Sequence, residues 1–440
     1  MRIPATQSDT EDYTGIAGLG LIGLAIGRAG LDSLLSKPVR GIVDADVLKS
    51  YLGLLSIGKT DFEAIEAQRK NPFFHTALAI GRVPSAARLR QRMDTQAMGY
   101  ARTIDQANQQ FLVNVGVPVT PLSCGHVALD MDLFPLDNSG TRKEGVGYTY
   151  KGFDGYGVMG AYLGQEGWCL TNELKPGSEN GQLGFGFILD RVLPAARQLT
   201  PLPLLVRLDS GHDAQENRAR FAHEDVDFII KWNPRCEKPS HWLAHAQQLG
   251  HWVDWQSPRE GKRVATFTDY VTRHWQGQEV TCRRVMRLIE RTIDRQGQIL
   301  LVPEVELHGW WTSLDLPDEQ IIALYRDHAT SEQFHSEFKT DLDLERLPSG
   351  KFDTNTLIMA MGGFVYNVLR WIGLVGLIGQ HAPLRHPAKR RRLRTVMQEL
   401  IYLAAKFYHR SRQCGLRFGR YCPAFEAYVH VDAQLWTVPI

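Results

Sequence analysis

The spacing of apolar residues makes the first quarter of the chain look helical. Apolar side chains recur at helical intervals in residues 17–35, 45–55 and 62–69, as in helices that bury one face. Ser85 precedes a further helical stretch and is a residue type that caps helix N-termini well. We therefore predict a mainly helical N-terminal region over residues 1–122.

From His126 the pattern changes to short apolar runs separated by turn residues. Two of these runs end in Asp: HVALDMD ends at Asp132, and LPLLVRLD ends at Asp209. Runs of this length bounded by Pro or Gly are typical of buried strands. We also predict a hairpin meander up to residue 163, helices at 183–196 and 214–222, and a strand at 227–232. This order predicts the first part of an α/β core over residues 123–232.

Residues 233–314 read as a β-rich insertion. Strand candidates lie at 264–268, 279–290 and 297–302, where apolar and polar residues alternate or short apolar runs occur. The second candidate carries Arg283, Arg284 and Arg287. Tryptophans concentrate in and around this insertion, at Trp232, Trp242, Trp252, Trp255, Trp275, Trp310 and Trp311. Most are expected in the core, and one is a candidate for stacking on an unpaired base.

The segment from Tyr325 to Lys339 is predicted to be a helix that carries candidate catalytic and binding residues. It contains no Pro or Gly, and Tyr325, His328, Glu332 and Lys339 are separated by 3, 4 and 7 residues. This spacing places the four side chains along one stripe if the segment is helical. We assign residues 315–380 to the second part of the core, with Glu332 on its functional helix.

A long apolar stretch at residues 356–379 raises the question of a membrane span. Several glycines and the central Arg370 favour a helix packed within the protein, so we expect no membrane partner. The densest basic run of the chain follows and includes Lys389, Arg390, Arg391 and Arg392. We predict that this run contacts the DNA backbone, within a basic helical C-terminal region at 381–440.

The amino-acid composition excludes few classes of protein. The 440 residues are 43% hydrophobic and 22% charged, which is ordinary for a globular protein. The net charge of +2 does not indicate a nucleic-acid binder, so any basic surface must come from local clusters. Six cysteines without a Cys-x-x-Cys pair are expected to be reduced thiols. Acidic residues ahead of the first apolar stretch are unlike a secretory signal, so we expect a cytoplasmic protein.

The acidic residues at the predicted strand ends and on the predicted helix suggest a metal site. Asp132, Asp209 and Glu332 could together hold two divalent cations. Two such ions about 3.5–4 Å apart stabilise both the attacking and the leaving oxygen when a phosphodiester is cut. Asp130 alternates to the same face of the strand as Asp132, so either one could be the first acid.

In these motifs the sequence resembles the DDE transposases of bacterial insertion sequences, in the group with the third motif Y-x2-R-x3-E-x6-K. Tyr325, Glu332 and Lys339 keep that spacing, and His328 stands where the family has Arg. The run VRLDSGHD around Asp209 resembles the second motif, and LDMD at 129–132 resembles the first. Phe134 stands where the family has Thr, and Asp132 aligns with the first catalytic acid. The resemblance covers most of the chain.

This resemblance implies a ribonuclease H-like α/β core that is interrupted by the β-rich insertion. It implies a cut-and-paste transposase that hydrolyses DNA at transposon ends and transfers the strands into target DNA. The implied cofactor is a pair of Mg²⁺ ions, with Mn²⁺ able to substitute, held by Asp132, Asp209 and Glu332. The implied DNA contacts are Tyr325, His328, Lys339, Arg283, Arg284, Arg287, Lys389, Arg390, Arg391 and Arg392.

The resemblance also implies partners and a location. The partners are double-stranded DNA, as terminal inverted repeats and as target, and further copies of the chain in a homodimer or higher assembly. The location is the bacterial cytoplasm, on the nucleoid when bound to DNA.

Two other functions are consistent with parts of the sequence. A catalytically inactive DNA-binding protein derived from a transposase predicts a broken set of acids, whereas the set here is complete in the sequence. A metal-dependent phosphoesterase of small substrates predicts a closed pocket and no basic track. The run at 385–394 and the arginines at 283–287 argue against that alternative.

Overall fold

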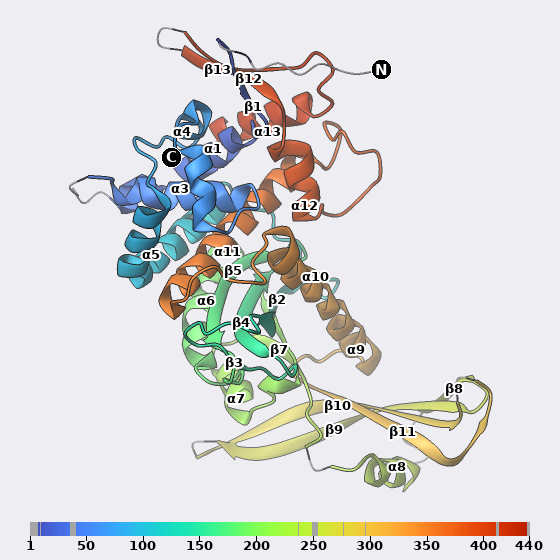
Figure 1. Ribbon diagram of the computed structural model, residues 1–440. Coiled ribbons are helices and arrows are strands. Elements are labelled where there is room, and N and C mark those ends of the chain that lie inside the picture. The colour runs from blue at the N-terminus through green and yellow to red at the C-terminus, as the bar shows by residue number, and fades with distance from the viewer. Residues whose placement is uncertain are drawn as a thin grey trace.

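The computed structural model describes residues 8, 10–35, 41–235, 237–248, 254–275, 277–294, 296–410 and 413–437. Helices from both ends of the sequence lie together in one part of the molecule, and a mixed sheet occupies the other (Figure 1). A long β-hairpin arm extends from the sheet (Figure 1).

The N-terminal region is mainly helical, as predicted. Its helices are α1 (Leu19–Arg28), α2 (Leu31–Leu34), α3 (Asp44–Ser56), the 3-10 helix η1 (Phe62–Gln68), α4 (Pro72–Ala77) and α5 (Ala86–Asn114). Ser85 caps α5, because its Oγ accepts a hydrogen bond from the backbone N–H of Arg88 at 3.3 Å. A short strand that the pattern did not predict, β1 (Asp12–Thr14), pairs with β12 near the C-terminus.

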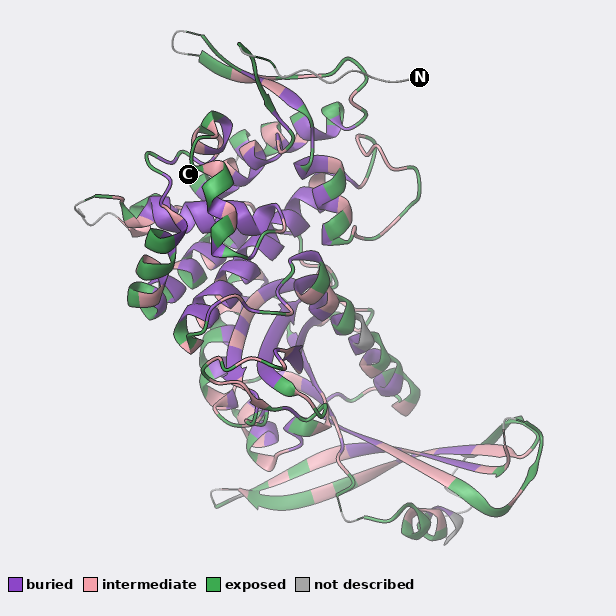
Figure 2. Ribbon diagram, viewed as in Figure 1, coloured by how far each residue is buried: buried purple, intermediate pink, exposed green. Residues whose placement is uncertain are grey.

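The long apolar helix α11 (Phe352–Gly376) lies in the interior against α5 and β5. Among the described residues it is the one helix long and apolar enough to cross a bilayer, and 83% of its apolar window is buried within the protein. Its polar residues have internal partners: Asn367 bonds to the backbone of Cys169, and Arg370 pairs with Glu337. Figure 2 shows α11 almost wholly in the buried class.

The central sheet has the strand order β3-β4-β2-β6-β7-β11-β10-β9-β8, and β5 pairs with the edge of β4 that faces away from β2, next to β3. The last four strands of this order are β11 (Ile299–Thr312), β10 (Gln278–Ile293), β9 (Lys262–Trp275) and β8 (Asp254–Arg259). The strands of its first part are β2 (Val127–Asp137), β3 (Gly147–Tyr148), β4 (Asp154–Leu163), β5 (Trp168–Pro176), β6 (Leu204–Leu208) and β7 (Asp227–Lys231). β2 runs antiparallel to β4 and parallel to β6, and β6 runs parallel to β7. The predicted meander and both predicted acid-bearing strands are therefore present, but β2 continues to Asp137, beyond its predicted end at Asp132.

Helices cover both faces of this sheet. α6 (Phe185–Leu199) and α7 (Gln215–His223) lie on one side, and α9 (Asp318–Arg326) and α10 (Ser331–Ser336) lie on the other (Figure 1). Helices were predicted at 183–196 and 214–222, so α6 and α7 match within a few residues. Alternate residues of β6 and β7 serve the two sides, because Leu205 and Ile229 pack with α9 while Val206 and Phe228 belong to the larger core.

The β-rich insertion continues the central sheet. Its strands are β8 (Asp254–Arg259), β9 (Lys262–Trp275), β10 (Gln278–Ile293) and β11 (Ile299–Thr312). The last three residues of β11 pair with β7, with Trp310 opposite Lys231. The arm is thus fixed at its root by backbone hydrogen bonds to the core. A helix that was not predicted, α8 (Pro239–Gln248), precedes these strands.

The segment 325–339 is not the single helix that its spacing predicted. α9 ends at Arg326, a 3-10 turn η3 (Asp327–Thr330) follows, and α10 passes into a π-helix η4 (Glu337–Asp341). These departures have tertiary causes: His328 in the 3-10 turn bonds to Asp130, and Glu337 in the π-helix pairs with the buried Arg370. The four candidate side chains consequently do not share one regular helical stripe.

The C-terminal region also differs from the helical prediction. It contains α12 (Leu393–Val396), the π-helix η5 (Met397–Ile401) and α13 (Phe425–Thr437), but also a hairpin of β12 (Ala405–Arg410) and β13 (Gln413–Phe418). The hairpin forms because β12 also pairs with β1 from the other end of the chain. The described cysteines, at 124, 169, 282, 414 and 422, are free thiols, and Cys236 lies outside the described residues.

Candidate active site

Two aspartates lie side by side where the parallel pairing of β2 with β6 ends. Met131 of β2 is opposite Leu208 of β6, so Asp132 and Asp209 are the next residues of the two strands. The Asp209 carboxylate accepts a hydrogen bond from the backbone N–H of Gly211 at 3.1 Å. The carboxyl ends of parallel strands are where α/β sheets place their ligands, and this edge is therefore the candidate active site.

Asp130, the alternative first acid, is already occupied by protein groups. The Arg207 guanidinium donates two hydrogen bonds to its carboxylate at 2.6 and 2.7 Å, and His328 Nδ1 lies 3.0 Å from the same carboxylate. Both Asp130 and Arg207 are buried. Burial favours the neutral acid, but Arg207 and His328 outweigh it and lower the pKa of Asp130. Its negative charge is thus neutralised within the fold.

Asp132 has the opposite environment. Burial, followed by the negative charge of Asp209 and more weakly that of Glu332, raises its pKa to about 7, while His328 opposes them. In the described part of the chain, no Lys or Arg forms an ion pair with any of these three acids. A carboxylate with a raised pKa and acidic neighbours is stabilised in its charged form when a cation binds.

His335 lies against Asp132 and is a neutral imidazole. Its Nδ1 is 3.9 Å from Asp132 Oδ2 and its ring stacks on Phe134 at 4.2 Å. Burial, followed by the positive charge of His328, lowers its pKa to about 3. Its Nε2 is buried without a hydrogen-bond partner in the described residues. His335 therefore adds no positive charge to the acidic edge.

Glu332 is exposed on α10, and its negative charge contributes to the raised pKa of Asp132. Among the residues that the structure describes, no three His, Cys, Asp or Glu side chains form a group that could hold a metal ion. The acids are thus neighbours without forming a closed coordination shell. Carboxylate oxygens are the ligands that hard divalent cations prefer, so the residues fit such a cation in charge and in chemistry.

The other residues of the third motif surround this edge in different ways. Tyr325 is half-buried on α9, and burial, Asp209 and Asp132 raise its pKa well above its usual value. His328 is buried against Asp130. Lys339 lies in η4, with its Nζ 3.8 Å from Glu345 Oε2 and 5.9 Å from the centre of the Phe134 ring.

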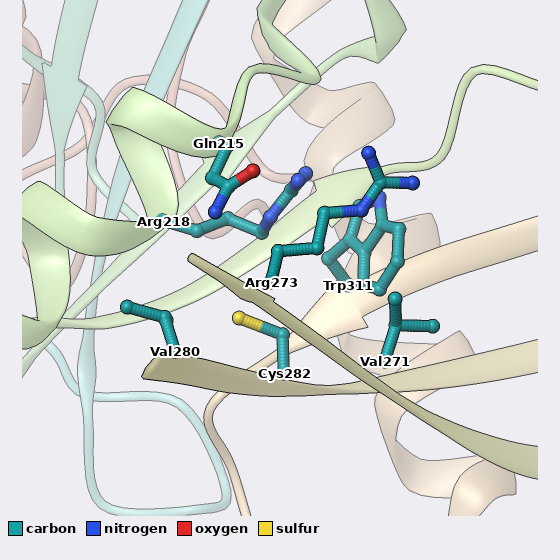
Figure 3. Close-up of a pocket in the computed structure, with 7 residues that line it drawn as sticks. All are labelled: Gln215, Arg218, Val271, Arg273, Val280, Cys282 and Trp311. Atoms are coloured by element: carbon teal, nitrogen blue, oxygen red, sulfur yellow. The ribbon is translucent and has the colours of Figure 1, made fainter. Parts of the chain in front are cut away.

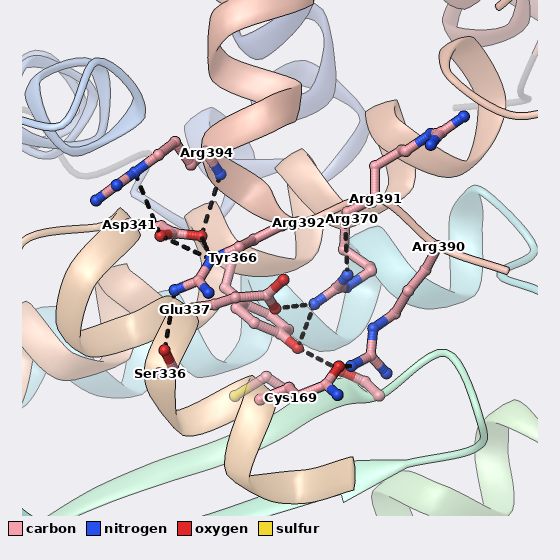
Figure 4. Close-up of polar contacts among 12 residues, drawn as sticks. Cys169, Ser336, Glu337, Asp341, Tyr366, Arg370, Arg390, Arg391, Arg392 and Arg394 are labelled. Atoms are coloured by element: carbon pink, nitrogen blue, oxygen red, sulfur yellow. Dashed lines mark hydrogen bonds and ion pairs between the residues drawn. The ribbon is translucent and has the colours of Figure 1, made fainter. Parts of the chain in front are cut away.

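The basic run at 385–394 binds the segment that carries Glu332 and Lys339 (Figure 4). Arg390 donates to Gln333 Oε1 at 2.5 Å and lies over the Phe334 ring at 4.4 Å. Arg392 pairs with Asp341 at 2.8 Å. The remaining contacts are Arg391 with the carbonyls of Leu377 and His386, Arg392 with Ser336 and Thr340, and Arg394 with Asp341.

Lys389, in the same run, lines a surface cavity of about 680 Å³ together with Asp130 and Arg207. In the described chain, several of the arginines predicted to contact DNA thus hold the Glu332 segment. We call Arg390, Arg392 and Arg394 the C-terminal clamp.

The three arginines of the hairpin arm differ in their surroundings. Arg283 pairs with Asp318 at 2.5 Å and bonds to the carbonyls of Leu314 and Leu316, which ties the arm to α9. Arg284 is buried between tryptophans and pairs with Asp269 at 2.5 Å. Arg287 forms no ion pair or hydrogen bond within the described residues. DNA contacts by Arg283 and Arg284 stay predictions, and both have internal partners here.

The root of the arm is built from aromatic rings and guanidinium groups. Arg284 lies within 5.1 Å of the ring centres of Trp232, Trp242 and Trp311, and Arg218 lies 4.4 Å from that of Trp311. Figure 3 shows Arg218, Arg273 and Trp311 around a cavity of about 10 Å³, which is about the volume of one water molecule. This part of the arm is structural.

The predicted base-stacking tryptophan has few candidates. Trp232, Trp310 and Trp311 are buried, so they are not available to a base. Trp242 and Trp275 are half-buried. Trp252 lies outside the described residues, as does the side chain of Trp255.

Four residues near the acids were missed from the sequence. Tyr150 donates from its hydroxyl to the Leu133 carbonyl at 2.8 Å, and burial together with Asp132 and Asp209 raises its pKa to about 12. No spacing rule links this loop residue to the site. Arg207, two residues before Asp209, and His335, three after Glu332, share a face with predicted acids and could have been found. The fourth is Lys231, the last residue of β7.

Comparison with known proteins gives a family match over most of the chain. The model of the family described as transposase DDE domain, group 1, matches residues 43–439. No curated protein sequence matches the chain. Among solved structures, the piggyBac transposase synaptic complex with hairpin DNA aligns with 82% of this chain and 75% of its own, at 10% identity and a TM-score of 0.38.

Proposed function

The chain belongs to the family of transposase DDE domains, group 1, and from this premise we propose that it is the cut-and-paste transposase of a bacterial insertion sequence. Enzymes of this family are nucleases and strand transferases that generally use divalent metal ions. The observation that carries the proposal is the pair Asp132 and Asp209, side by side where the parallel pairing of β2 with β6 ends. Their negative charges have no Lys or Arg partner in the described chain.

We assign the metal ligands to Asp132, Asp209 and Glu332. Bound Mg²⁺, as two ions, would activate the attacking water or 3′ hydroxyl and stabilise the leaving oxygen, and Mn²⁺ would substitute. Asp130 is excluded from the ligand set by this proposal, because its oxygens are bound by Arg207 and His328. Its role is to fix the positions of the strand β6 and the turn η3 next to the acids.

The sheet topology supports a ribonuclease H-like core. Three antiparallel strands, β5, β4 and β2, are followed by β6 and β7, which run parallel to β2. The acids then lie on β2, after β6 and on the helical segment that covers the same face. We propose that the substrate is double-stranded DNA, as terminal inverted repeats and target, bound by a dimer or higher assembly in the bacterial cytoplasm and nucleoid.

Lys339, Tyr325 and Lys389 are the proposed DNA contacts closest to the acids. Lys339 and Tyr325 lie on the helical segment that carries Glu332, and Lys389 lines the cavity beside Asp130. In contrast, His328 bonds to Asp130, so we assign it a positioning role there.

The test is cleavage of linear DNA that carries the sequences flanking the gene on both sides. The purified full-length protein is expected to cut this DNA with Mg²⁺ or Mn²⁺ and not with EDTA. Asp132→Asn, Asp209→Asn and Glu332→Gln should each lower the rate at least about 10³-fold while DNA binding persists, since metal ions contribute several kcal/mol to such transition states.

Asp190→Asn is the matched control, because Asp190 is an exposed acid on α6 that pairs with Arg220. It should leave the rate unchanged. Binding without cleavage by the wild-type protein would instead indicate the inactive DNA-binding alternative. Cleavage that survives loss of Asp132 or Asp209 would remove the catalytic assignment.

A further inference from the structure

A row of residues continues from the acids along the edge of the sheet. Leu208 of β6 is opposite Ile230 of β7, so Lys231 follows Asp132 and Asp209 as the next residue in the row. Lys231 is opposite Trp310 of β11. On the same face of β11 and β10, His308 is opposite Arg287. Side chains opposite one another in a sheet point to the same side, so acids and bases share one face.

Lys231 lies among aromatic rings, and no carboxylate of the described chain pairs with it. Its Nζ lies 4.1 Å from the centre of the Trp310 ring, 5.9 Å from that of Tyr325, and 3.4 Å from His308 Nδ1. No Asp or Glu in the described chain forms an ion pair with it. Burial lowers the pKa of Lys231 to about 8. A cation–π contact contributes about 0.5–2 kcal/mol and leaves the ammonium donors without an acceptor anion.

Arg287 is the second cation that forms no ion pair with an acid of the described chain. It forms no ion pair or hydrogen bond with the described residues, and its Nε is buried without a partner. Burial, followed by the positive charge of Arg326, lowers its pKa, and Glu319 opposes them. Buried donors are normally satisfied, so this guanidinium is arranged to meet an acceptor that the chain does not supply.

The acids nearest to this pair are engaged elsewhere. Glu306 faces His308 Nε2 at 3.7 Å, but its carboxylate accepts two hydrogen bonds from Arg291, at 2.6 and 3.0 Å. Glu319 accepts a hydrogen bond from Thr266 at 3.1 Å. Glu319 keeps its negative charge and acts on Arg287 through space, but no acid in the described chain forms an ion pair with Lys231 or Arg287, so both cations keep donors for an anion.

We propose that Lys231 and Arg287 form a binding site for a DNA backbone phosphate, next to the phosphodiester that is cut at Asp132 and Asp209. This phosphate site rests on the proposed function, and it adds the path that the bound DNA strand takes along the protein. Because Lys231 is on the strand next to Asp209 and Arg287 is two strands further on, in β10, the phosphate is a neighbour of the scissile one along the same strand. A strand laid along this edge would pass from the acids of the core to the root of the hairpin arm.

The test is a double-mutant cycle between side chain and phosphate. Single phosphates around the cleavage site of the flanking DNA are replaced in turn by neutral methylphosphonates, and binding is measured with Ca²⁺ present. Lys231→Ala and Arg287→Ala should each weaken binding of unmodified DNA about 5- to 50-fold, as for a charge-assisted hydrogen bond. On the duplex that lacks the contacted phosphate, both variants should bind as wild type does.

A second readout is the salt dependence of binding. The slope of log K against log salt should fall by about 0.9 for each variant, as for one lost phosphate contact. Arg197→Ala, an exposed arginine on α6 that pairs with Glu224, is the matched control and should change neither readout. Lys231→Arg should keep most of the affinity.

The outcomes separate this site from the proposed function. If wild-type protein cuts the DNA but the loss in Lys231→Ala is the same for every methylphosphonate position, the phosphate site is wrong and the transposase assignment stands. If wild-type protein neither binds nor cuts the flanking DNA, the proposed function fails and the site fails with it.

Discussion

At the scale of single residues, the two acids of β2 show how neighbours decide a role. Asp130 and Asp132 lie on the same strand and the same face. Asp130 meets the side chain of Arg207, which is opposite it on β6. Asp132 is two residues further along β2, beside Asp209, where the pairing with β6 ends. Asp130 is therefore part of a buried ion pair, whereas no Lys or Arg of the described chain pairs with Asp132.

Asp130→Ala is expected to destabilise the fold by about 3–5 kcal/mol, because it leaves Arg207 buried without its partner. The folded-state pKa of Asp130 is lowered, so its contribution is present above the unfolded pKa of about 3.9 and is lost as the pH falls through the folded value. Urea denaturation at neutral pH measures the loss. An Asp130→Ala protein as stable as wild type would contradict the structural role.

Asp132→Asn is expected to behave in the opposite way. The folded-state pKa of Asp132 is about 7, so its ionisation costs stability as the pH rises from about 4 to 7. Without metal, the variant should therefore equal or exceed wild type in stability above pH 7. Added Mg²⁺ should raise the melting temperature of wild type and not of the variant. A loss of stability like that of Asp130→Ala would show that Asp132 is structural.

At the scale of elements, the segment from α9 to η4 is held in an irregular shape by contacts from elsewhere. The C-terminal clamp binds one side of it through Gln333 and Asp341. Arg370 of α11 binds Glu337 from the interior, and the Tyr366 hydroxyl is 2.8 Å from the same guanidinium. These contacts fix the position of the segment that carries Glu332.

Glu337→Ala should lower stability by about 3–5 kcal/mol, because it leaves the fully buried Arg370 unpaired. It should also slow DNA cleavage through the displaced Glu332. The double variant Glu337→Leu with Arg370→Met removes both charges and should recover much of the stability. Denaturation curves for the single and double variants measure this coupling. Equal losses in the single and double variants would show that the pair does not hold the segment.

At the scale of the whole molecule, positive charge is concentrated in local clusters and there is little overall excess. The chain has a net charge of only +2, and many arginines that the sequence offered for DNA are paired inside the fold. Lys231, Arg287, Lys339 and Lys389 are the basic residues that we propose for DNA binding at the acidic edge and along the sheet beside it. The binding surface is thus a property of the fold.

DNA binding should nevertheless depend steeply on salt, because it rests on displaced counterions. If about four phosphates are neutralised, a rise from about 50 to 200 mM salt should weaken binding on the order of 100-fold. Fluorescence anisotropy with a labelled duplex measures the slope. Binding that changes less than about threefold over this range would exclude a surface built from these cations.

Much of the fold could be predicted because apolar spacing is a local property. The N-terminal helices, the two acid-bearing strands, α6, α7 and the interior position of α11 follow from it. The hairpin at 405–418 and the interrupted helix at 325–339 could not be predicted in this way. The first depends on pairing with β1, almost 400 residues away, and the second on Asp130 and Arg370.

The sequence by itself determined the fold class, the family motifs and the three acids proposed to act. Motif spacing and the residues at strand ends can be read from the sequence directly, because they do not depend on which distant residues come together in the fold. Only the tertiary structure decided that Asp130 is neutralised, that the basic run clamps the Glu332 segment, and that Lys231 and Arg287 form no ion pair with an acid in the described part of the chain. The physical reason is that the state of a charge depends on which other charges lie within a few ångströms, and folding alone brings those residues together.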